Sequence, residues 1–67
     1  MFNNIINKLK ENLTPNNGDI LNISIYDDEA INVEYNGNSY KFYMDDFDDG
    51  DDMYNNIFYF CVDLFEQ

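Results

Sequence analysis

The chain has 67 residues, which is enough for one domain spanning residues 1–67 but too short for a second core or an enclosed substrate cavity. Fourteen Asp and Glu stand against three Lys, so the net charge is -11. Direct binding to nucleic acid or to an anionic membrane is disfavoured, because both need basic side chains. A basic partner is expected instead, the alternative being that the acidity serves only solubility or reflects a halophilic host.

The cysteine and histidine content limits the stabilising chemistry. Cys61 is the only cysteine and the chain has no His, so no internal disulfide can form, and we expect the core to rely on aromatic side chains. Polar residues interrupt the apolar residues of Met1 to Leu13, which is unlike a signal peptide. We therefore expect the protein in a reducing cytoplasm.

The first segment is predicted to be a helix that ends at a strong break. Its apolar residues recur at the spacing of one helical face: Phe2, Ile5, Ile6, Leu9 and Leu13. Residues 14–18 then combine Thr, Pro, Asn and Gly, which are typical of a turn.

Three alternating segments follow and are predicted to be strands: residues 20–26, 31–35 and 40–44. Asn36-Gly37 favours a two-residue type I′ turn, and a three-residue loop over Asp27–Glu29 joins the first two strands. This register pairs Ile25 with Ile31 and Ile31 with Phe42. All apolar side chains then share one face, which holds Leu21, Ile23, Ile25, Ile31, Val33, Tyr35, Tyr40, Phe42 and Met44.

A second helix is predicted at the C-terminal end. Its apolar residues are Met53, Ile57, Phe60, Cys61 and Leu64. Residues 57–62 are also rich in strand-forming types, so a strand is the alternative; Asp51 and Asp52 favour the helix because carboxylates suit a first turn. The predicted fold is α+β, a three-stranded antiparallel meander with an N-terminal and a C-terminal helix packed on one face (α-β-β-β-α).

The acidic run of residues 45–52 first suggests a calcium loop. An EF-hand with its glycine at Gly50 would place Phe47 at the third ligand position and Asn56 where a bidentate Glu is required. We therefore expect no specific metal site and no cofactor. Catalysis is not expected either, because the chain has no base beside a nucleophile and Cys61 lies in an apolar stretch.

The predicted register brings two acidic segments together. Pairing Ala30 with Tyr43 sets the loop between the first two strands beside the end of the third strand. Carboxylates crowded in this way can take the place of nucleic-acid phosphates, and Phe47 among them would anchor an interface or fold back onto the core. A disordered, solvated acidic loop is the alternative. The candidate partner-binding residues are Asp27, Asp28, Glu29, Asp45, Asp46, Phe47, Asp48, Asp49, Asp51 and Asp52. We expect charge reversal at Asp45, Asp46, Asp48 and Asp49 to leave the fold intact and to abolish partner binding.

The order of elements, the tight Asn36-Gly37 turn and the acidic run together resemble small phage-encoded anti-CRISPR proteins, particularly the type II inhibitors that mimic DNA. The resemblance implies that the protein blocks the basic DNA-binding groove of a CRISPR effector or of another host-defence nuclease, where arginines would pair with the carboxylates. The rival interpretation is an immunity protein or antitoxin that neutralises a basic toxin nuclease.

Overall fold

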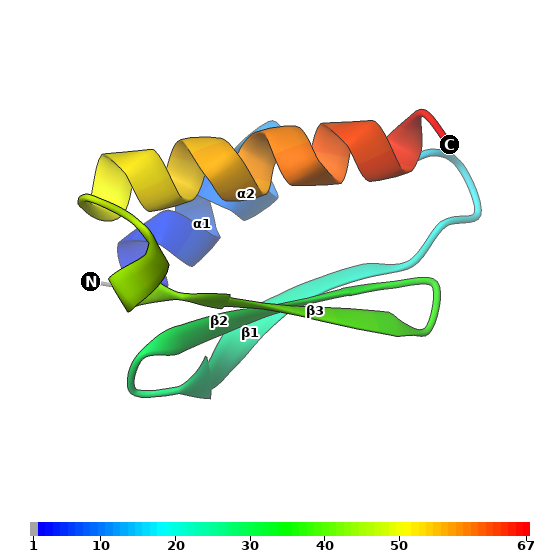
Figure 1. The fold of residues 1–67 in the computed structure, drawn as a ribbon. Helices are drawn as coiled ribbons and strands as arrows, with labels where there is room; N and C mark the ends of the chain where they lie inside the picture. Colours follow the sequence, from blue (N-terminus) through cyan, green and yellow to red (C-terminus); the bar gives the residue numbers. More distant parts are fainter. Residues whose placement is uncertain (1) are drawn as a thin grey trace.

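The computed structural model describes residues 2–67 and has the predicted α-β-β-β-α order. Helix α1 spans Phe2–Asn12 and helix α2 spans Gly50–Phe65, and both cover the same face of an antiparallel sheet (Figure 1). The strands are β1 (Leu21–Asp27), β2 (Ala30–Tyr35) and β3 (Asn38–Tyr43), in the order β1-β2-β3. The fold class is therefore α+β, as predicted, and the ambiguous C-terminal segment is a helix.

The turn between β2 and β3 has the predicted geometry. Asn36 and Gly37 both have positive φ, 50° and 92°, as a type I′ turn requires. The turn fixes the pairing of Tyr35 with Asn38 and of Ile31 with Phe42, so this half of the register is confirmed.

The turn between β1 and β2 differs in detail from the prediction. Strand β1 continues to Asp27, which pairs with Ala30, and the register shifts between Ile25 and Asp27. The connection is thus shorter than the predicted three-residue loop, and a bulge at Tyr26 compensates for the difference. The predicted pairing of Ile25 with Ile31 survives for this reason.

The centre of the core is aliphatic, so the expectation of an aromatic core is wrong. The largest fully buried side chains are Leu9, Ile31, Met53, Ile57, Val33 and Cys61. Aromatic residues surround this centre while remaining partly buried; Phe60, for example, packs edge to face against Tyr40 and Phe42 at centroid distances of 4.9 and 5.2 Å. Branched aliphatic chains fill the narrow space between helices and sheet, and the larger rings close its margins.

Two apolar residues depart from their predicted places. Met44 leaves the third strand and begins a 3₁₀ helix, η1 (Met44–Asp46), although its side chain still packs partly against the core. Ile25 lies on the helix-covered side of the sheet by register, yet its side chain is 49% exposed, compared with 4% for Ile23. The start of α1 covers this end of β1 only in part.

Candidate functional site: an acidic end of the molecule

The structure brings the two acidic segments to one end of the molecule. Ala30 pairs with Tyr43, and the backbone N–H of Met44 donates to the carbonyl of Glu29 at 2.8 Å. These contacts fix η1 beside the β1–β2 turn. We call the carboxylates of the two segments the acidic end: Asp27, Asp28, Glu29, Asp45, Asp46, Asp48, Asp49, Asp51 and Asp52.

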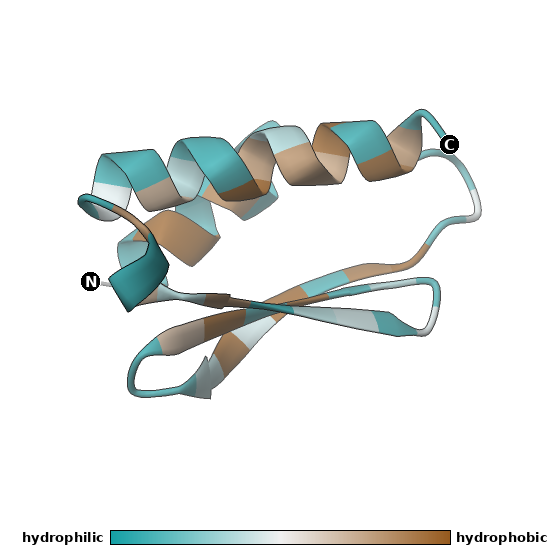
Figure 2. Cartoon of the chain, viewed as in Figure 1, coloured by the Kyte–Doolittle hydropathy of each residue, from teal (hydrophilic) through white to brown (hydrophobic). Residues whose placement is uncertain are grey.

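The acidic end occupies one tip of a body that measures 31 × 19 × 18 Å. The start of α2, η1 and the β1–β2 turn all lie there, away from the β2–β3 turn and the C-terminus (Figure 1). Hydrophilic residues, in teal, make up much of η1 and of the β1–β2 turn, whereas hydrophobic residues, in brown, recur along the helices and the strands (Figure 2). Helix α2 begins close to α1, since a Cβ atom on Gly50 would lie 3.8 Å from Ile5 Cδ1.

Two of the carboxylates stabilise the start of α2, and one of them, Asp49, is among the four that were expected to be dispensable for folding. Asp49 is the N-cap of α2, and its Oδ1 accepts a hydrogen bond from the backbone N–H of Asp52 at 2.8 Å. Asp52 in turn accepts from the N–H of Asp48 at 3.1 Å and from the side chain of Asn56. Asp49 thus satisfies one of the N–H groups that the first turn of a helix leaves without partners, and Asp52 ties the residue before the cap to the helix. The spacing of an Asp three residues before a second Asp at a helix start could have indicated this role.

Asp27 also forms a hydrogen bond within its own turn. Its Oδ1 accepts from the backbone N–H of Glu29 at 2.8 Å, which stabilises the tight turn. The other six carboxylates of the acidic end are exposed and accept no hydrogen bond from residues 2–67. They are Asp28, Glu29, Asp45, Asp46, Asp48 and Asp51.

Phe47 lies within the acidic run but does not project freely. Its side chain is partly buried and packs against the hydrophobic core, which is the second of the two alternatives considered for it. Phe47 therefore contributes to the core and is not a freely exposed anchor at the acidic end.

Two of the three lysines contact aromatic rings. Lys8 Nζ lies 4.5 Å from the centroid of the Tyr54 ring, and Lys41 Nζ lies 4.7 Å from that of Tyr26. Tyr26 and Tyr43 are 52% and 40% exposed on the sheet face that the helices leave open. These cation–π contacts hold the two ammonium groups on α1 and on the open sheet face, and among residues 2–67 no lysine forms an ion pair with the acidic end.

At the opposite end of the molecule, the carboxylate of Asp19 is part of a hydrogen-bond network. Asp19 accepts hydrogen bonds from the Tyr35 hydroxyl and from Asn36 Nδ2, the latter at 3.1 Å. Asn36 also pairs with Ile20 through 2.8 and 2.9 Å hydrogen bonds. The bonds from Tyr35 and Asn36 hold the pKa of Asp19 below its usual value, and the Asp19 carboxylate raises the pKa of Tyr35. Sequence reasoning did not identify this network, because it depends on where the segment before β1 lies.

Other site chemistry is limited in the described part of the chain. Among residues 2–67, no group of three or more Asp, Glu, Cys or His side chains could hold a metal ion. Burial raises the pKa of the Cys61 thiol to about 11, which keeps it protonated and unreactive at neutral pH. No helix within these residues has the length and apolar character needed to cross a bilayer.

Comparison with known proteins adds no functional assignment: no family model, curated protein or solved structure matches this chain. The geometry and charge of the acidic end carry the functional argument.

Proposed function

We propose that the protein inhibits a nucleic-acid-binding enzyme of host defence, such as a CRISPR effector, by occupying its basic groove. The single observation that supports this proposal is the set of six uncommitted, exposed carboxylates at one end of the fold. Six charges without intramolecular partners are available to arginines and lysines of another protein.

Electrostatics supports the same proposal. Duplex DNA presents about one charge per 1.7 Å of its axis, and basic grooves are shaped to receive charges at that density. Carboxylates fixed on adjoining turns and a helix start approach such crowding without a nucleic-acid strand. With a net charge of -11, the protein would also be drawn rapidly toward a basic surface at low salt. The mechanism is occlusion, with neither catalysis nor a cofactor.

The experiment is capture on the immobilised protein from a bacterial lysate at low ionic strength, followed by elution with duplex DNA. We expect the DNA to release a basic nuclease, because DNA and the inhibitor would compete for one groove. Retention should also fall steeply with added salt. A captured protein that DNA does not displace would contradict the proposal, and a captured toxin nuclease would indicate an immunity protein instead.

A further inference from the structure

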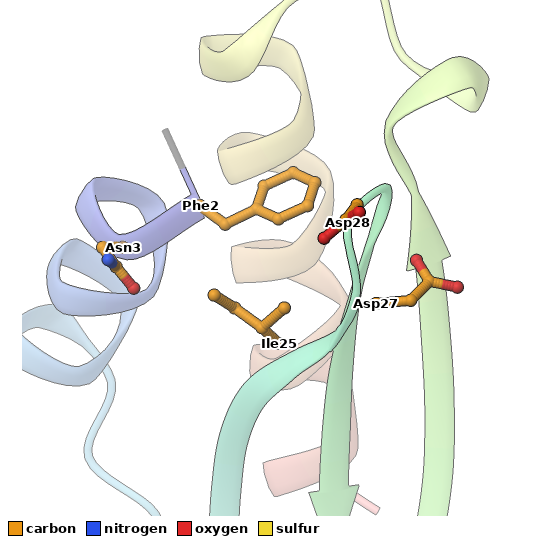
Figure 3. Close-up of a pocket in the computed structure, with 5 residues that line it drawn as sticks. All are labelled: Phe2, Asn3, Ile25, Asp27 and Asp28. Atoms are coloured by element: carbon orange, nitrogen blue, oxygen red, sulfur yellow. The ribbon is translucent and has the colours of Figure 1, made fainter.

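A small pocket opens at the acidic end, between the start of α1 and the β1–β2 turn. Its volume is about 250 Å³, and it is lined by Phe2, Asn3, Ile25, Asp27 and Asp28 (Figure 3). Pockets that enclose drug-sized ligands measure about 300 to 1,000 Å³. The space suits one side chain of a partner better than a free cofactor.

The pocket has an apolar wall that residues 2–67 cover only in part. Ile25 belongs by register to the helix-covered side of β1, but α1 begins at Phe2 and leaves 49% of the Ile25 side chain exposed. The Phe2 ring extends from α1 toward the β1–β2 turn and forms the second apolar surface (Figure 3). An aliphatic chain inserted here would gain contact with both residues.

The pocket also has an anionic rim. The carboxylate of Asp28 points toward the Phe2 ring, whereas Asp27 points away toward β3 (Figure 3). Asp27 already accepts the Glu29 N–H, but Asp28 accepts no hydrogen bond from residues 2–67. A neutral apolar ligand would remove water from Asp28 without replacing its hydrogen bonds, and an anion would be repelled.

We propose that this pocket receives an arginine side chain of the basic partner. This inference rests on the proposed function and names the residue type that the acidic end recognises. The aliphatic stem of the arginine lies against Ile25, and the planar guanidinium packs on the Phe2 ring while donating to Asp28. Lysine fits less well, because its compact and strongly hydrated ammonium cannot stack on a ring and bind a carboxylate with two parallel donors.

The test is an NMR titration of the full chain with N-acetyl-arginine amide at low ionic strength, using N-acetyl-lysine amide for comparison. We expect saturable shifts centred on Asn3, Ile25 and Asp28 and on the Phe2 ring protons, with weaker binding of the lysine compound. Shifts that are centred on residues 45–52, or equal affinities for the two compounds, would overturn the proposal.

Matched variants separate the pocket from the general charge. Asp28→Asn and Asp51→Asn each remove one charge from the acidic end, but only Asp28 lines the pocket. We expect Asp28→Asn to weaken arginine-amide binding about fivefold and Asp51→Asn to change it less than twofold. Equal losses would show that only the overall field acts and would refute the pocket.

A second pair tests the apolar wall. Ile25→Ser should weaken binding, whereas Ile20→Ser should not, because Ile20 is 64% exposed and lies just before β1, at the other end of that strand from the pocket. Unchanged spectra outside each substituted site establish that the variants fold. These titrations use no partner protein, so a failed pocket is distinguishable from failed capture: the pocket can fail while DNA-displaceable capture persists.

Discussion

The acidic end and the opposite end of the molecule use carboxylates differently. At the opposite end, Asp19 accepts hydrogen bonds from Tyr35 and Asn36 and joins the segment before β1 to the β2–β3 turn. At the acidic end, six of nine carboxylates accept no hydrogen bond from residues 2–67. A carboxylate thus stabilises the fold at the opposite end, whereas at the acidic end the carboxylates repel one another and lower the stability of the fold. The carboxylates without hydrogen-bond partners in residues 2–67 are the reason that we propose the acidic end as a binding surface.

The largest effect on stability is expected where the acidic end does contribute to the fold. Replacement of the N-cap in Asp49→Ala leaves the Asp52 N–H without its acceptor, so the free energy of unfolding should fall by about 1 kcal/mol. Urea denaturation followed by circular dichroism measures this change. Asp48→Ala is the matched control, because the Asp48 side chain accepts no hydrogen bond within the described chain, and an equal loss there would contradict the assigned cap.

Neutralising carboxylates that accept no hydrogen bond should have a smaller effect of opposite sign, a gain in stability. We define the acidic-end variant as the combination Glu29→Gln, Asp45→Asn, Asp46→Asn and Asp48→Asn. Relief of repulsion should raise its free energy of unfolding by about 0.5 kcal/mol at low salt, and added salt should shrink the gain. Destabilisation instead would show that these side chains have structural partners after all.

The pH dependence of stability tests whether the Asp19 carboxylate stabilises the opposite end of the molecule. Because the pKa of Asp19 is lowered in the folded protein, its contribution is present above its unfolded pKa and is lost as pH falls through the folded value. The stability advantage of the wild type over Asp19→Asn should therefore narrow below about pH 4. Urea denaturation at a series of pH values measures it, and an advantage that is constant with pH would contradict the assigned hydrogen bonds.

The smallest expected effect is the contribution of Tyr35 to stability, which changes only at alkaline pH. Its pKa is raised in the folded protein by Asp19, so its contribution is full below the unfolded pKa and disappears as pH rises through the folded value. The stability difference between the wild type and Tyr35→Phe should persist to about pH 10 and vanish above it. If the wild type remains more stable than Tyr35→Phe at higher pH, the hydrogen bond to Asp19 is not the cause, and the stability difference comes from packing of the ring against Phe65.

The sheet could be predicted from the sequence because several local signals agree. Alternation in three segments and the Asn36-Gly37 turn permit only one register that gathers the apolar residues on one face. The proximity of the two acidic segments follows from that register. Local signals at Asp51 and Asp52 were also sufficient to favour a helix for the last segment, and α2 includes both residues in its first turn.

Other features could not be predicted because they depend on how elements lie on one another. The exposure of Ile25 results from how the start of α1 lies over the sheet, and the alternating pattern carries no such information. The partly buried position of Phe47 and the bulge at Tyr26 likewise arise from packing and chain closure. The pocket beside Phe2 follows from the same placement of α1 and was invisible in the sequence.

The most direct test of the central claim compares two variants of equal charge in the capture experiment. The acidic-end variant and a control with Glu11→Gln, Glu34→Gln, Asp63→Asn and Glu66→Gln each lose four carboxylates, so each has a net charge of -11 + 4 = -7. We predict that the control retains the DNA-displaceable partner and that the acidic-end variant loses it. Equal retention by both variants, or equal loss, would contradict the claim that the acidic end is the binding surface.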